Sequence, residues 1–68
     1  MELRYSPHFT ERLIERFSKT VDDIILSPAN VEFIGWSRNG CYKIRIININ
    51  AVVVVSLSGI AITIYPKD

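Results

Sequence analysis

The chain has 68 residues, of which 49% are hydrophobic and only three each are Gly or Pro. This length predicts one domain, residues 1–68, and the composition excludes an intrinsically disordered chain. Eight Lys and Arg against seven Asp and Glu leave a formal charge of +1. Such a balance excludes a strong overall field that attracts nucleic acid, so any site for a polyanion has to be local.

The cysteine count and the apolar runs indicate where the protein resides. A single cysteine, Cys41, excludes an internal disulfide and a cysteine-based zinc site. The longest apolar run, Ala51 to Val55, is far shorter than the ~20 residues of a membrane-spanning helix, and the N-terminus does not resemble a secretory signal. We therefore expect a cytoplasmic protein without a membrane segment. One His with scattered acids and no glycine-rich phosphate loop predict no metal and no cofactor.

The N-terminal region predicts a helix after a short first strand at Leu3 to Tyr5. Ser6 is a good N-cap residue, and Pro7 suits the first helical position. From Pro7 to Ser18 the periodicity is helical, and one broad sector collects the apolar side chains, namely Phe9, Leu13, Ile14 and Phe17. We expect this sector to face the core.

A second, shorter helix is predicted to follow the first one. Thr20 is an N-cap candidate, and Asp22 and Asp23 place acids in the first turn. The helix is expected to stop near Leu26, because Ser27-Pro28 follows.

From Val31 onward the chain is rich in β-branched and aromatic residues, which favour strands. Polar turns divide this region, and the Asn39-Gly40 pair is the strongest turn signal because both residue types tolerate positive φ. Short links predict an antiparallel meander. The expected fold is α+β, with two N-terminal helices on a four-stranded sheet whose strands lie near 31–36, 41–48, 51–57 and 60–65.

The strand near 51–57 contains four consecutive valines, Val52 to Val55. A strand without polar alternation is typical of a position inside the sheet with both faces covered. Two short helices cover only one face, so we expect a homodimer or a protein partner to cover the other, helix-free face.

Candidate catalytic residues lie on the first helix, where a spacing of four aligns His8, Arg12 and Arg16. An imidazole transfers protons near neutral pH, and guanidinium groups bind phosphate oxygens, so this grouping suits phosphodiester chemistry. Polar helix faces also carry such residues without a catalytic role. In that interpretation Glu11 and Glu15 pair with the arginines as surface salt bridges.

Four further candidates come from the strands. Lys43 and Arg45 alternate with apolar residues and project from one face, as phosphate contacts or as charges that protect a sheet edge. Thr63 and Tyr65 project together and carry hydroxyls able to contact a substrate. Phe33 and Trp36 near the first turn are able to stack on a base, but aromatic residues in so small a protein usually belong to the core, and we expect them there. Cys41 is expected to be a buried, inert thiol.

Both ends of the chain resemble a family of short bacterial and phage domains of unknown function. The resemblance rests on Ser6-Pro7-His8 with Arg12 and Arg16, on Asp23-Ile24, and on a hydrophobic strand, a Gly turn and Thr-x-Tyr at Val52 to Ser56, Gly59 and Thr63 to Tyr65. That family is grouped with RelE-like and barnase-like ribonuclease toxins, which have helices followed by an antiparallel sheet and cleave RNA without a metal. Here Phe17 replaces the Gly that usually follows the second helical Arg.

The resemblance implies a small metal-independent ribonuclease, a toxin or a phage effector, in which His8 is the general acid or base. Arg12 and Arg16 then hold the scissile phosphate, and Lys43, Arg45, Thr63 and Tyr65 contact RNA. An antitoxin is the partner that such a protein would have. The alternative is a non-catalytic interaction module, an inhibitor or adaptor, that binds another protein through the exposed sheet face.

Overall fold

The computed structural model describes residues 2–68 and has an α+β fold with one α-helix and a mixed five-stranded sheet. The strands follow the spatial order β1-β5-β4-β3-β2. The elements are β1 (Arg4–Tyr5), α1 (Pro7–Phe17), β2 (Val31–Trp36), β3 (Tyr42–Ile46), β4 (Ala51–Val55) and β5 (Ile60–Pro66). Three single-turn 3-10 helices lie between them, η1 (Val21–Asp23), η2 (Arg38–Gly40) and η3 (Ile47–Ile49).

Helix α1 begins and ends as the sequence predicts. The Ser6 hydroxyl accepts a hydrogen bond from the backbone N–H of Phe9, and the left-handed backbone of Ser18 closes the C-terminus. Phe9 and Leu13 are fully buried and Phe17 is partly buried against the core. The expectation that Ile14 also faces the core is wrong, because its side chain is 60% exposed. The covered stripe of α1 is narrow because the helix packs mainly along one strand, β5.

The predicted second α-helix is wrong, since only the single turn η1 forms there. Its N-terminal signal is present, because the Asp23 carboxylate accepts a hydrogen bond from the Thr20 N–H at 2.9 Å. At Ile24, however, the backbone becomes extended, and this side chain is buried in the core. Continued helix would carry the chain away from the sheet that Ile24 packs against.

Strands β2 to β5 form the predicted antiparallel meander, and β4 lies inside the sheet. Positive φ at Asn39 and Gly40 confirms the predicted turn between β2 and β3. The sheet is nevertheless mixed, because the short first strand β1 pairs in parallel with β5 and adds a fifth strand. A parallel pairing between the two ends of the chain is set by tertiary structure and has no local sequence signal.

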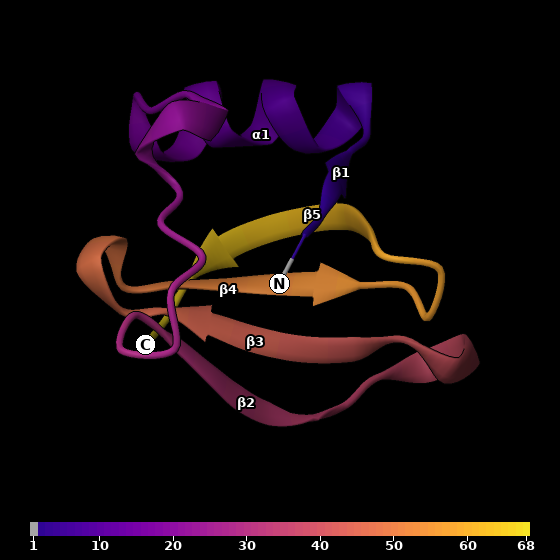
Figure 1. Ribbon diagram of the computed structural model, residues 1–68. Coiled ribbons are helices and arrows are strands. Elements are labelled where there is room, and N and C mark those ends of the chain that lie inside the picture. The colour runs from indigo at the N-terminus through magenta and orange to yellow at the C-terminus, as the bar shows by residue number, and fades with distance from the viewer. Residues whose placement is uncertain (1) are drawn as a thin grey trace.

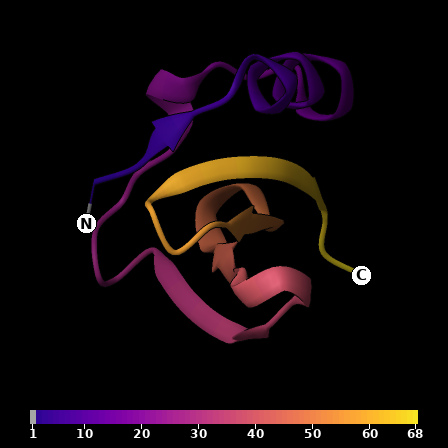
Figure 2. The same ribbon diagram turned by 90° about the vertical axis from the view of Figure 1, so that its right-hand side faces the viewer.

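The layers are visible in Figure 1, where α1 lies beside β5 and an extended segment descends from η1 to β2. The edge-on view of Figure 2 places this segment and the C-terminus on opposite sides of the sheet. One face of the sheet packs with α1 and Ile24 around the core, which includes Ile44, Val53 and Ile64. No helix among residues 2–68 has the length and apolarity to cross a membrane.

The helix-free face does not expose the valine strand. Val52 points to this face, yet it is only 3% exposed, because Arg45 and Tyr65 flank it on the neighbouring strands and the C-terminal residues lie beside it. Val54 is half-buried. Side chains of the same chain thus cover Val52 and part of Val54, while Ile34 on β2 stays exposed, and association through this face stays a prediction.

Candidate functional site

The four predicted binding residues of the sheet lie on one face, hereafter the Lys43 face, made of Lys43, Arg45, Thr63 and Tyr65. The strand register pairs Lys43 with Val54 and Val54 with Thr63, and it pairs Arg45 with Val52 and Val52 with Tyr65. Residues in register across neighbouring strands project to the same side. Two adjacent rows therefore each place a cation on β3 and a hydroxyl on β5, with a valine between them.

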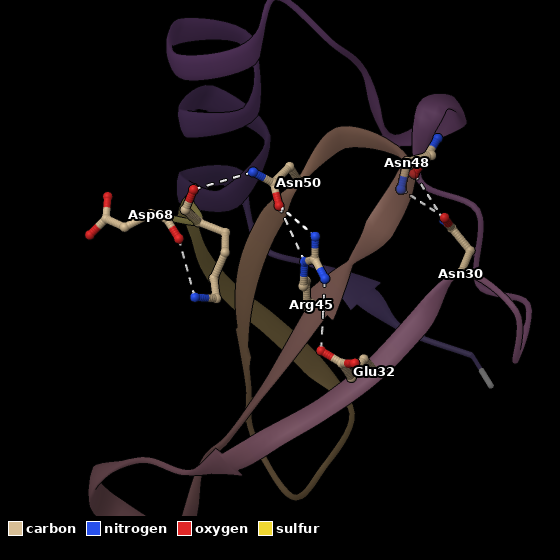
Figure 3. A network of polar contacts seen from close by, with 7 residues as sticks. Asn30, Glu32, Arg45, Asn48, Asn50 and Asp68 are labelled. Carbon is tan, nitrogen blue, oxygen red and sulfur yellow. Dashed lines mark hydrogen bonds and ion pairs between the residues drawn. The ribbon is translucent and has the colours of Figure 1, made fainter.

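Arg45 is held in a defined orientation at one end of the Lys43 face. Its Nε and Nη2 atoms donate to the Asn50 side-chain oxygen at 3.2 and 2.9 Å, and Nη1 lies 4.0 Å from a Glu32 carboxylate oxygen. Figure 3 shows the guanidinium between these two residues. Asn50 takes this position because its left-handed backbone closes the turn before β4. The guanidinium of Arg45 is thus partly occupied, while the Lys43 side chain makes no hydrogen bond or ion pair within residues 2–68.

A shallow recess of about 200 Å³ opens on the Lys43 face. Lys43, Tyr65 and Val52 line it together with Ile34 and the C-terminal segment. That segment is fixed by a reciprocal pair of bonds, since the Lys67 N–H donates to the Asn50 carbonyl at 2.9 Å and the Asn50 side-chain amide donates to the Lys67 carbonyl at 3.3 Å. The recess thus combines ammonium groups and a phenol with a small apolar floor, and Asp68 lies at its rim.

The helical candidates have other partners. Arg16 reaches across to β5, where its Nη1 donates to the Ile64 carbonyl at 2.6 Å. Arg12 pairs with Glu15 at 2.9 Å, as predicted if His8, Arg12 and Arg16 form an ordinary polar helix face. The His8 side chain is exposed and makes no hydrogen bond or ion pair within residues 2–68. None of the side-chain hydrogen bonds or ion pairs within residues 2–68 joins these three residues to the Lys43 face.

Arg16 and Ser6 together donate hydrogen bonds to backbone carbonyls on the open edge of β5. The Ser6 hydroxyl donates to the Ile62 carbonyl at 3.4 Å, and Arg16 binds the carbonyl of Ile64, two residues further along. Strand β1 pairs only with Ile60 and Ala61, so these two side chains continue the bonding where the backbone of β1 ends. Arg16 therefore has a structural role that sequence spacing could not distinguish from phosphate binding.

The distribution of charge along the chain supports the sheet as the binding region. Residues 33–67 contain four cations, Arg38, Lys43, Arg45 and Lys67, and no Asp or Glu. Six of the seven acids lie in residues 1–32. A net charge near zero thus conceals a segment from β3 to β5 without acids, although Glu32 on β2 lies beside it, and counting charges by segment is the signal that detects it.

A cluster of exposed aromatic residues was not predicted. Phe33 and Trp36 on β2 are 57% and 67% exposed, so the expectation that they belong to the core is wrong. Together with Tyr42 on β3 they form the aromatic cluster, whose ring centroids lie 5.9 to 6.3 Å apart. They share the face of the core, but α1 covers β5 and does not reach β2. Cys41 is also only half-buried, contrary to expectation.

The Lys43 face has the chemistry to bind anions that carry oxygen atoms. Ammonium and guanidinium groups attract phosphates, and hydroxyl groups donate hydrogen bonds to them. Within residues 2–68 no three His, Cys, Asp or Glu side chains group in a way that would hold a metal ion. Comparison of the chain with protein-family models, with curated proteins and with solved structures found no match.

Proposed function

We propose that this protein is a small ribonuclease-like domain that binds RNA through its phosphates on the Lys43 face. The observation that carries the proposal is the placement of Lys43, Arg45, Thr63 and Tyr65 on one face of the sheet, where Glu32 lies beside Arg45 and the Lys43 side chain has no ion pair within residues 2–68. The resemblance of both chain ends to ribonuclease-like domains supports RNA as the polyanion. Hydroxyl groups at Thr63 and Tyr65 are suited to contact both phosphate and ribose oxygens.

The roles of the residues follow from their surroundings. Lys43 is the principal phosphate ligand, because its ammonium group forms no ion pair within residues 2–68, although Asp68 lines the same recess. Arg45 has its fork turned toward Asn50 and Glu32, so it contributes charge and holds the shape of the face. Tyr65 lines the same recess as Lys43, so its phenol is available to the same ligand.

The geometry supports binding more strongly than cleavage. Attack by an RNA 2′-hydroxyl needs a proton acceptor within hydrogen-bond reach. His8 is the one imidazole of the chain, and none of its contacts connects it to the Lys43 face. We therefore propose RNA binding as the function of the Lys43 face. Cleavage by His8, Arg12 and Arg16 on α1 is a second part of the hypothesis that can be tested separately.

The alternative interaction module was based on an uncovered apolar face. Val52 is buried within the chain, and the helix-free face carries cations and hydroxyls. No observation on this face favours a protein partner or a second copy. Association through it stays a prediction without structural support.

The test is a titration of a fluorescently labelled, unstructured RNA with the protein in chelator at several salt concentrations. Binding to single strands should weaken with a slope of about −0.7 for each phosphate contacted in a plot of log K against log salt. Lys43→Ala should lower the affinity and reduce the slope by about 0.7. Lys19→Ala, which removes an exposed lysine outside the sheet, is the matched control and should change neither.

Two results would overturn the proposal. The first is no RNA binding at low salt by the folded protein, and the second is equal loss of affinity in Lys43→Ala and Lys19→Ala. Gel analysis of the same samples for shortened RNA tests cleavage independently, because binding by Lys43 and proton transfer by His8 are removed by different substitutions.

A further inference from the structure

The aromatic cluster is an exposed surface that has no role in the proposed phosphate binding at the Lys43 face. Trp36 contacts both Phe33 and Tyr42 edge to face, with interplanar angles of 71° and 78°. These contacts hold the indole in place, while two thirds of its surface stays open to solvent. Large exposed aromatic groups in such a small protein indicate a binding surface.

The cluster and the Lys43 face meet at one sheet edge. Strand β2 is the outer strand, and Trp36 follows directly after Gly35, which pairs with Lys43. At the position of a Gly35 Cβ no atom lies within 4 Å. The edge is therefore open beside Lys43, and a flexible chain bound there has a short route around β2 to the aromatic cluster.

The charge around the aromatic cluster favours an anionic ligand over a second copy of the chain. The hairpin of β2 and β3 carries Arg38, Lys43 and Arg45, and its one carboxylate, Glu32, lies beside Arg45 at the end of the hairpin opposite Trp36. A second copy docked on this edge would bring the same cations against each other, which disfavours association. An anionic ligand with planar apolar groups satisfies both the charge and the aromatic rings.

We infer that the aromatic cluster stacks unpaired bases of single-stranded RNA whose phosphates lie at Lys43. This inference rests on the proposed function and specifies its substrate class. Stacking of bases on aromatic side chains is the usual means of binding single strands without sequence preference. A duplex keeps the faces of its bases inside its own stack, so it offers phosphates to Lys43 but no base to Trp36.

Trp36 is the only tryptophan of the chain, so its fluorescence reports on the proposed site directly. Addition of an unstructured oligoribonucleotide to the intact protein should quench this emission in proportion to the bound fraction. A base-free polyphosphate of equal charge should bind to Lys43 without the quenching that stacking produces. An RNA duplex of equal length should bind more weakly than the single strand.

Substitutions provide the second measurement. Trp36→Leu should weaken binding of the labelled single strand roughly 5- to 150-fold, the range for loss of one base stacked on an aromatic ring. Ile14→Ala removes a similarly exposed apolar side chain from α1 and should leave affinity unchanged. Because Trp36 is exposed, circular dichroism should show both variants folded, and Phe33→Leu tests the same surface if Trp36→Leu does not fold.

The outcomes separate this inference from the proposed function. If RNA binds and Lys43→Ala weakens it, but Trp36→Leu and the fluorescence show no effect, base stacking is wrong and phosphate binding stands. Equal affinity for duplex and single strand also overturns the inference. If Trp36 emission changes with protein concentration alone and sedimentation shows a dimer, the cluster is an interface between two copies. Failure of every RNA to bind overturns both proposals together.

Discussion

Replacement of Arg16 distinguishes a structural from a phosphate-binding role for the helical stripe. In Arg16→Ala the Ile64 carbonyl on the open edge of β5 loses its 2.6 Å bond to the guanidinium. A hydrogen bond that involves a charged group contributes about 1.5–3 kcal/mol when it is shielded from water. Because Arg16 is exposed, we expect a loss of about 1 kcal/mol in the free energy of unfolding, since water replaces part of the bond.

For a chain of this size 1 kcal/mol corresponds to a decrease in Tm of about 4–8 °C. Thermal unfolding followed by circular dichroism measures it. Arg12→Ala is the matched control, because its exposed pair with Glu15 contributes only about 0.3–0.5 kcal/mol. RNA affinity of folded Arg16→Ala should equal that of the unsubstituted protein. If Arg16→Ala has the same Tm as Arg12→Ala but no longer binds RNA, Arg16 is a phosphate ligand and the structural argument is wrong.

Three further substitutions test the core, the sheet edge and the histidine. Phe9→Ala should cost about 3–5 kcal/mol in unfolding free energy, because the ring is fully buried against Tyr5 and the core; urea denaturation measures this loss, and a cost below 1 kcal/mol would contradict the packing of α1. Gly35→Glu places a carboxylate beside Lys43 in open space, so RNA binding should weaken. Gly35→Gln adds a side chain of similar size without the charge and should retain binding. Equal RNA affinities in the two variants would argue against phosphate binding beside Lys43 at the edge formed by β2. His8→Ala should leave RNA affinity unchanged, since the His8 side chain makes no hydrogen bond or ion pair with the Lys43 face. If this variant binds RNA but no longer cleaves it, His8 on α1 is the catalytic residue. If the variant still cleaves RNA, His8 has no role in the mechanism.

Much of the candidate site was predictable because it depends on alternation within single strands. Lys43 and Arg45 share a face whatever the sheet contains, and so do Thr63 and Tyr65, since side chains two residues apart point the same way. That these two pairs share one face with each other depends on the register across β4. Register is a property of two paired strands and is not encoded in either of them alone.

Features that short-range interactions control could be predicted from the residues alone. Ser6 and Pro7 begin α1, Asn39 and Gly40 turn the chain between β2 and β3, and the β-branched composition produces the meander, because caps, turns and strand preferences act within a few residues. The surface that α1 covers depends instead on long-range packing. The helix packs along β5 and not across β2, so Ile14 and Trp36 stay exposed and Arg16 binds a backbone carbonyl. These outcomes depend on contacts between residues far apart in the chain, and no local pattern specifies which apolar sector receives a partner.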